Sequence, residues 1–210
     1  VTPALLRSRE GAVLREDGKF RVWFSSTDFR DPSGAHTLHE SHSADGIAWT
    51  PPSGEQMRGV YAPTVIKDGS EYRMWYADVS AEPWVIRHAQ SKDGRNWTVT
   101  EGASIEISQD WETNRLFYPT VVKIDELYLM WYGAYWSGRP NTTALGFAVS
   151  EDGIEWTKHP GNPVFAPDPE RPWESHYTTS QTVMRLNGGS WRMWYATREA
   201  PPFVNKYFAI

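Results

Sequence analysis

The sequence predicts an all-β fold built from four-stranded antiparallel units, because two short motifs recur along its 210 residues. The first is an aromatic strand that ends close to Met-Trp-Tyr, at 22–24, 74–76, 130–132 and 193–195. The second, Ser-x-Asp-Gly-x-x-Trp, follows three of these strands, at 43–49, 91–97 and 150–156. A repeat of roughly 50–60 residues with four strands is typical of a β-propeller blade. The sequence therefore predicts a β-propeller with about four blade repeats visible.

The composition fits this fold and excludes several functional classes. The chain holds 12 Trp, 10 Tyr and 8 Phe, and so many aromatic residues suit β-sheets that pack face to face. A net charge of −5 without a block of Lys or Arg argues against nucleic acid and against a membrane as partners. No apolar run approaches the ~18 residues of a membrane span. The lack of Cys excludes disulfides and Cys-based zinc sites. We expect an exported protein, periplasmic or extracellular, and the composition leaves its oligomeric state open.

The best-preserved repeat shows the expected order of elements. These are a strand at 62–66, a turn at 67–70, a strand at 72–76, a strand at 85–91, a turn at 93–94 and a short strand that Trp97 opens. The second strand alternates in period two. Asp-Gly supplies both turns, because this dipeptide accepts the positive φ that a tight hairpin turn needs.

The same order extends over the chain as a single domain, residues 1–210. The blade units are 11–52, 61–101, 118–165 and 179–210. The last unit reaches its third strand at 206–210. Segment 1–6 matches 162–165, which follows a fourth strand, so we expect 1–6 to serve as a strand that closes the last blade. Two arrangements remain open: a ring closed as four blades, or part of a larger propeller with open sheet edges.

The two faces of such a propeller differ in composition. The turns between strands one and two and between strands three and four are short and uniform, and we interpret them as turn chemistry only. The other face carries long, irregular loops and the links between blades, where function usually lies. Aromatic rings stack on sugars and charged groups bind their hydroxyls. The candidate substrate-binding residues on that face are Arg58, Tyr61, Trp84, Arg115, Tyr118, Trp136, His176, Tyr177 and Arg198.

The repeat resembles a known superfamily. The strings YAPTVIKDGSEYRMWYAD at 61–78 and LGFAVSEDGIEWTKHPGNPVF at 145–165 are similar to repeats of the five-bladed propellers of glycoside hydrolase families 43, 32, 68, 117 and 130, above all to uncharacterised bacterial members. The resemblance covers essentially the whole chain. It implies a propeller of the five-bladed type and carbohydrate as the partner. The shared strings belong to the scaffold, so they indicate the fold more strongly than the activity.

The resemblance also implies three carboxylates at the inner strands: an Asp base before Pro, an Asp that tunes the pKa, and a Glu acid. The chain departs from this pattern, because Gly59 stands where the tuning Asp belongs and no inner strand starts with Asp-Pro. Glu10-Gly11-Ala12 resembles the context of the acid. The candidate catalytic residues are therefore Glu10, Asp78 after a second strand, and Glu174 in a link between blades. Glu112 and Glu174 share a Trp-Glu motif, which is more typical of a structural role.

Three functions fit this surface. The first is a glycoside hydrolase-like enzyme, which needs a carboxyl pair with separated pKa values. The second is a propeller that binds glycan or protein without catalysis, which the incomplete carboxylate set favours. The third is a sialidase-like propeller, since Ser-x-Asp-Gly-x-x-Trp resembles the Asp box. We expect no cofactor and no metal site, because the histidines lack a metal-binding spacing and no residue pattern supports a calcium or other ion in the propeller channel.

Overall fold

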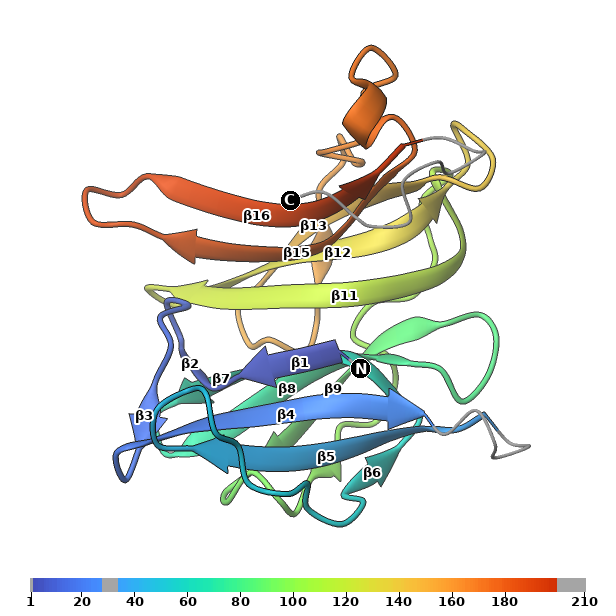
Figure 1. Cartoon of the computed structure of the whole chain (residues 1–210). Helices are drawn as coiled ribbons and strands as arrows, with labels where there is room; N and C mark the ends of the chain where they lie inside the picture. Colours follow the sequence, from blue (N-terminus) through green and yellow to red (C-terminus); the bar gives the residue numbers. More distant parts are fainter. Residues whose placement is uncertain (1, 28–33, 200–210) are drawn as a thin grey trace.

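A computed structural model describes residues 2–27 and 34–199, and these residues form four sheets in which all strand pairs but one are antiparallel (Figure 1). The first sheet contains β1 (Thr2–Leu5), β4 (Lys19–Thr27), β5 (His36–Ser43) and β6 (Met57–Arg58), with β3 (Arg15–Glu16) beside β4. The second contains β7 (Val60–Asp68), β8 (Glu71–Asp78), β9 (Val85–Ser91) and β10 (Thr98–Val99), with β2 (Arg7–Ser8) parallel to β7. The third contains β11 (Glu112–Ile124), β12 (Leu127–Trp136), β13 (Thr143–Ser150) and β14 (Thr157–Lys158). The fourth contains β15 (Tyr177–Arg185) and β16 (Trp191–Arg198), and a short 3-10 turn, η1 (Pro172–Glu174), precedes it.

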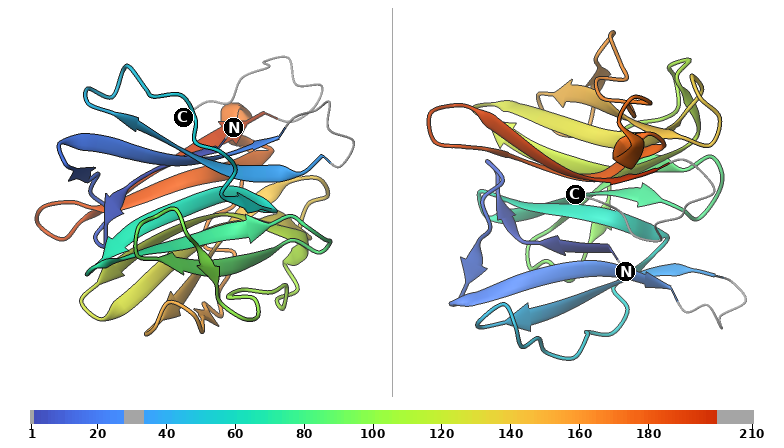
Figure 2. Two further views of the ribbon diagram at one scale, coloured as in Figure 1. Left: turned by 90° about the horizontal axis from the view of Figure 1, so that it is seen from below. Right: turned by 45° about the horizontal axis from the view of Figure 1, so that its top comes forward.

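The expected propeller blades are confirmed in the second and third sheets. Their strands pair in the order first, second, third and fourth, as the repeat predicts. In Figure 1 the fourth and third sheets lie above the second and first, and Figure 2 shows the sheets fanned around a common centre. The expected third strand of the last unit, at 206–210, lies outside the described residues.

The placement of the N-terminal strand corrects one expectation. Segment 1–6 was expected to close the last blade, but β1 pairs antiparallel with β4, and Ala4 lies opposite Trp23. In the second blade the corresponding partner of the aromatic strand is β7, where Thr64 lies opposite Trp75. β1 is therefore the innermost strand of the first blade, which begins at Thr2 and not near Gly11. This pairing contradicts the arrangement in which segment 1–6 closes a four-bladed ring.

The blades present two different faces. The hairpin turns between first and second strands lie at the left of Figure 1, and we call that side, together with the Ser-x-Asp-Gly turns, the turn face. The loops between second and third strands and the links between blades lie at the right, and we call that side the loop face. The antiparallel order of each sheet requires this division, because successive connections alternate between the two ends of the strands.

The Ser-x-Asp-Gly turns are held by their own side chains. In each of the three copies the Ser hydroxyl accepts from the Gly N–H at 2.7–2.8 Å, and the Asp carboxylate accepts from the two backbone N–H groups that follow Gly. These hydrogen bonds favour the charged form and lower the pKa of Asp45 and Asp93. The motif therefore builds a turn, as interpreted from the sequence.

The two repeated motifs also meet each other across the blades. Trp23 of the first blade donates its indole N–H to the Gly94 carbonyl of the second at 2.8 Å, and Trp75 of the second donates to Gly153 of the third at 2.8 Å. Both indoles are completely buried. We call each of these contacts a blade joint. A Cβ at Gly94 would lie 2.7 Å from the Trp23 ring, so the joint requires glycine.

Candidate functional site

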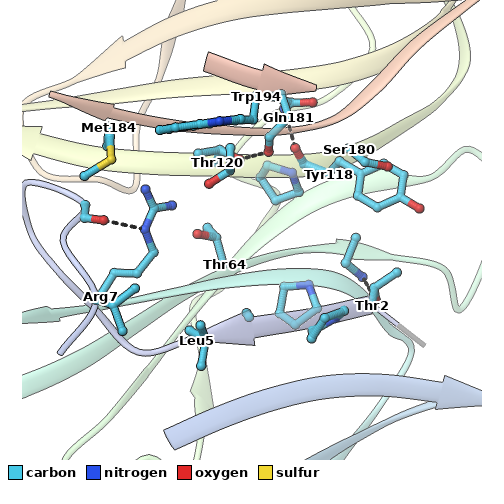
Figure 3. Close-up of a pocket in the computed structure, with 18 residues that line it drawn as sticks. Thr2, Leu5, Arg7, Thr64, Tyr118, Thr120, Ser180, Gln181, Met184 and Trp194 are labelled. Atoms are coloured by element: carbon cyan, nitrogen blue, oxygen red, sulfur yellow. Dashed lines mark hydrogen bonds between the residues drawn. The ribbon is translucent and has the colours of Figure 1, made fainter. Parts of the chain in front are cut away.

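The four inner strands line a central pocket of about 600 Å³ (Figure 3). Its walls come from β1, β7, β11, β15 and β16, and they include Thr2, Thr64, Tyr118, Thr120, Gln181 and Trp194. A bulge interrupts three of these strands, and the residue at the bulge has positive φ: Ala62 at 47°, Tyr118 at 50° and Ser180 at 51°. Bulges of this kind re-aim side chains next to functional sites.

No carboxylate faces this central pocket from the residues that the structure describes. The position before the inner-strand proline holds Thr2, Ala62 and Tyr118, and Ser180 holds it in the fourth blade, where Gln181 replaces proline. The resemblance places the catalytic base at such a position. The missing Asp-Pro in the sequence therefore corresponds to a pocket wall without a carboxylate among the described residues.

Residues 7–13 cross the turn-face end of the central pocket. The Arg7 guanidinium donates to the Gly11 carbonyl at 2.9 Å and to the Val183 carbonyl of β15, and the Lys123 N–H of β11 donates to the Arg9 carbonyl at 2.6 Å. Burial lowers the pKa of Arg7 to about 10, so it stays charged at neutral pH. Arg7 is the only ionised lining residue that the structure describes in this pocket.

Glu10 belongs to this crossing segment. Its carboxylate is exposed and lies 3.1 Å from the Arg9 guanidinium, which also donates to the carbonyl of Asp125 in the β11–β12 turn. The structure therefore places Glu10 on the turn face, at the end of the pocket opposite to the sugar-binding candidates. This position does not suit the general acid proposed from the sequence.

Tyr118, which lines the central pocket, contacts an aromatic side chain of the neighbouring blade. The hydroxyls of Tyr61 and Tyr118 lie 2.6 Å apart, and their ring centroids lie 5.4 Å apart. Trp84 approaches Tyr61 at 5.7 Å, and the Arg115 guanidinium lies 4.3 Å above the Trp84 ring. Burial and then the bond to Tyr118 raise the pKa of Tyr61. These four candidates from the sequence form a chain of contacts, and their role in binding stays a prediction.

A second hollow, which we call the loop-face cleft, follows directly along β11 and β15 and has a volume of about 910 Å³. It is lined by Thr113, Asn114, Arg115, Tyr135, Trp136, Ser137, Pro140, Asn141, His176 and Tyr177. Arg115 also holds the Glu82 carboxylate through its Nε at 2.8 Å. The cleft combines aromatic rings, amides and a cation, which is the composition expected for a sugar site.

His176 and two arginines form the electrostatic setting of the loop-face cleft. The Arg139 guanidinium donates to the Ser175 carbonyl at 2.6 Å, and the backbone N–H of His176 donates to the Arg198 carbonyl at 3.0 Å. Burial lowers the pKa of His176, and the charges of Arg139 and Arg198 lower it further. His176 is therefore neutral at pH 7. Its backbone bond to Arg198 places that residue beside the cleft.

The other two catalytic candidates lie on the loop face but are held in ion pairs. Asp78 ends β8, and its carboxylate lies 2.6 Å from the Arg87 Nε and accepts from the Ser80 N–H at 3.0 Å. Burial would raise the pKa of Asp78, but these hydrogen bonds and the Arg87 charge outweigh it and lower the pKa. Asp78 therefore stays ionised, which does not suit a general acid.

The contacts of Glu174 with a tyrosine and a cation are repeated at Glu112 in the preceding blade. It is 1% exposed, and it accepts from the Tyr195 hydroxyl at 2.6 Å and from Arg171 at 2.9 Å. Glu112, in the same Trp-Glu motif, accepts from the Tyr132 hydroxyl at 2.7 Å and from Lys158. The motif thus ties each link to the Tyr of the aromatic strand. Glu10, Asp78 and Glu174 contact different partners, and the structure does not bring them together.

The remaining placements show what the sequence missed. Arg58 lies on the outer strand β6, paired with Glu55 at 2.8 Å, and lines neither hollow. Asn114, Tyr135 and Asn141 line the loop-face cleft without having been singled out. Only their position in the sequence could have indicated them, because they lie at the loop-face ends of β11 and β12 and in the loop that follows.

Among residues 2–27 and 34–199, no group of three or more His, Asp or Glu side chains is arranged to hold a metal ion. No helix in this part of the chain is long and apolar enough to cross a membrane.

Comparisons with known proteins agree with the fold. A family model described as "Glycosyl hydrolases family 32 N-terminal domain" matches residues 64–206. An uncharacterised protein of Mycobacterium tuberculosis is 36% identical over 101 residues, which is 45% of this chain and 32% of that protein. The chain thus spans about a third of this relative's length.

Solved structures agree in the same way. One described as "Glycoside hydrolase" has a TM-score of 0.72 at 14% identity and covers 93% of this chain and 64% of its own. Another comes from a study of family 130 mannoside phosphorylases and hydrolases that target β-1,2 mannosidic linkages in Candida mannan. It has a TM-score of 0.68 at 17% identity and covers 95% of this chain and 60% of its own. These likenesses confirm the propeller fold, and this chain spans less than two thirds of either structure.

Proposed function

Because the chain belongs to the glycosyl hydrolase family 32 N-terminal domain family, we propose that its loop face binds an oligosaccharide. The observation that carries the proposal is the loop-face cleft, in which Tyr135, Trp136 and Tyr177 line one hollow together with Arg115. The central pocket continues this surface inward, because β11 and β15 line both hollows. Their volumes, about 910 and about 600 Å³, suit a ligand of several sugar units.

Binding without cleavage is the activity we assign to the described part of the chain. Hydrolysis needs two carboxyl groups about 5–10 Å apart on either side of the bond. Neither hollow is lined by a carboxylate from residues 2–27 or 34–199. Glu10, Asp78 and Glu174 are separated and engaged with other residues.

Hydrolysis is the second candidate, and family membership favours it. Its test is turnover of aryl arabinosides, xylosides and fructosides by the wild-type chain. Turnover that Asp78→Asn abolishes, without a change in melting temperature, would establish this candidate and contradict binding alone. We expect no turnover.

The experiment for binding compares Tyr177→Ala with Trp49→Ala in a glycan screen followed by titration calorimetry. Tyr177 lines the loop-face cleft, whereas Trp49 is 38% exposed on the turn face and serves as the matched aromatic control. Stacking of a sugar on an aromatic ring contributes about 1 kcal/mol or more, so we expect Tyr177→Ala to weaken binding at least about fivefold. Trp49→Ala should leave the affinity unchanged. Equal losses in both variants would contradict the proposed face.

A further inference from the structure

Arg7 is a cation in the wall of the central pocket, and it has no counter-charge among the described residues. Its guanidinium donates to two backbone carbonyls, those of Gly11 and Val183, and it forms no ion pair with a described carboxylate. A guanidinium has five N–H donors, so these two bonds leave three donors for another acceptor.

The acids of the turn face do not supply this counter-charge. Those around the crossing segment all lie outside the wall of the central pocket: Glu10, Glu16, Asp17, Asp68, Asp125 and Glu126. A carboxylate close to Arg7 would raise its pKa, but the pKa is lowered, and burial is the cause. A buried cation without a counter-charge lowers the stability of the fold, and a bound anion would offset that cost.

Two threonine hydroxyls of the same pocket are available to a ligand. Thr64 and Thr182 line the pocket, and neither hydroxyl forms a hydrogen bond with a described residue. The Thr120 hydroxyl, in contrast, donates to the Gln181 carbonyl at 2.6 Å. Figure 3 shows the side chains of Arg7 and Thr64 directed into one hollow. Together they offer N–H and O–H donors to the oxygens of an anion.

One wall of the central pocket is apolar and carries an exposed indole. Trp194 lies opposite Thr182 in its blade, the position that Trp23 and Trp75 occupy in theirs. Those two indoles are fully buried, whereas Trp194 is 38% exposed and lines the pocket together with Met184. The face of an aromatic side chain can stack on a ring of the ligand. The pocket of about 600 Å³ has room for such a ring, and a bare ion would leave most of it empty.

From this arrangement we propose that the central pocket binds a small acid in which a carboxylate is attached to a ring. The carboxylate accepts hydrogen bonds from Arg7 and Thr64, and the ring lies against Trp194. The planar N–H donors of arginine match the two oxygens of a carboxylate, and such charge-assisted bonds are the stronger ones. The inference goes beyond the proposed function, because it holds whether or not the loop-face cleft binds sugar. Sugar acids and other ring acids share this chemistry, and the experiment distinguishes them.

The experiment measures the affinity of the full chain by titration calorimetry at pH 7 for two matched pairs: glucuronate with glucose, and cyclohexanecarboxylate with cyclohexanol. In at least one pair we expect the acid to bind at least about tenfold more tightly than its neutral partner. A preference in the first pair alone identifies a sugar acid, and a preference in the second pair identifies a ring acid without need of hydroxyls. Inorganic phosphate is the third probe, and it should bind more weakly than the better acid, because it has no ring to contact Trp194.

A matched pair of variants locates the effect. Arg7→Gln should weaken binding of the acid by about tenfold and leave the neutral partner unchanged. Arg9→Gln is the control, because Arg9 carries the same charge in the same crossing segment, contacts Glu10 and the Asp125 carbonyl, and does not line the pocket. Should Arg7→Gln fail to fold, NMR of the wild-type chain decides. There the guanidinium N–H signal of Arg7 should shift with the acid and stay in place with its neutral partner.

The outcomes separate this inference from the proposed function. Equal affinities within both pairs, or no binding of either acid, would overturn the inference and leave oligosaccharide binding at the loop-face cleft standing. Equal losses in Arg7→Gln and Arg9→Gln, an unmoved Arg7 signal, or phosphate binding as tightly as the better acid would also overturn it. Binding of an acid that Arg7→Gln weakens, in a chain that binds no oligosaccharide, would contradict the proposed function and support the inference.

Discussion

The blade joints make a sharp prediction, because three equivalent glycines differ only in what they face. Gly46, Gly94 and Gly153 all lie in Ser-x-Asp-Gly turns with φ of +81°, +70° and +76°. A Cβ at Gly94 would lie 2.6 Å from the Arg21 guanidinium and 2.7 Å from the Trp23 ring. At Gly153 the nearest atom, on Trp75, is 3.0 Å away, and at Gly46 it is an ordinary 3.4 Å away.

The magnitude follows from these distances. Alanine at positive φ costs about 1 kcal/mol of folding stability at each site, and this contribution is common to all three. Overpacking adds about 1–3 kcal/mol where neighbours cannot move. Trp23 is fully buried, and Arg21 is held by Glu40 at 2.6 Å, so Gly94→Ala carries the largest addition. We expect losses of about 1 kcal/mol for Gly46→Ala, about 2 for Gly153→Ala and about 3 for Gly94→Ala.

The assay is urea unfolding followed by tryptophan fluorescence and far-UV circular dichroism. The order of the transition midpoints should be Gly46→Ala, Gly153→Ala, Gly94→Ala, from highest to lowest, with equal slopes. A difference of about 2 kcal/mol corresponds to roughly 4–8 °C in melting temperature for a chain of this size. Equal losses in all three variants would refute the view that the Trp–Gly contacts hold neighbouring blades together.

Two further predictions concern buried ionisable groups. Burial, with a smaller contribution from Arg73, lowers the pKa of His88 to about 3, so between about pH 6.5 and pH 3 only the unfolded chain takes up this proton. The free energy of unfolding should therefore fall as the pH drops below about 6.5, and His88 should contribute about 1.4 kcal/mol of this loss per pH unit. In urea titrations at several pH values, the stability of His88→Gln should depend less on pH than that of the wild type. Glu174→Gln should cost about 1–3 kcal/mol of stability, because Arg171 and Tyr195 lose their charged partner, yet leave sugar affinity unchanged. Lost affinity at unchanged stability would instead indicate a role of Glu174 in the site.

The sequence predicted most of the second and third blades because their periodicity, turns and aromatic strands all agree. The expected strand at 72–76 is confirmed within β8, and the expected strand at 85–91 coincides with β9. The Asp-Gly turns and the buried Trp75 also correspond to the interpretation from the repeat.

The first blade was harder to predict, because its inner strand is separated from its partner. Residues 7–13 leave the sheet between β1 and β4 and cross the end of the central pocket, so the usual short hairpin is lost. Thr2-Pro3-Ala4 corresponds to Ala62-Pro63-Thr64, but its likeness to 162–165 suggested a different pairing. Only the register of β1 with β4 decides between the two.

The candidate site was predicted in part for a similar reason. The face was identified by its long loops, and Tyr61, Trp84, Arg115 and Tyr118 do lie together. A carboxylate's role depends on its partners, and these come from other strands. Glu174 is bound by Tyr195, 21 residues later, and Glu10 lies on the opposite face because of the crossing segment.

The most direct test of the account is an amide and indole NMR titration with the oligosaccharide that binds best. The account predicts that the indole N–H signals of Trp84 and Trp136, on the loop face, shift as ligand is added. The signals of Trp49, Trp97 and Trp156, in the Ser-x-Asp-Gly motifs of the turn face, should stay in place. Shifts confined to those three tryptophans would contradict the assignment of function to the loop face.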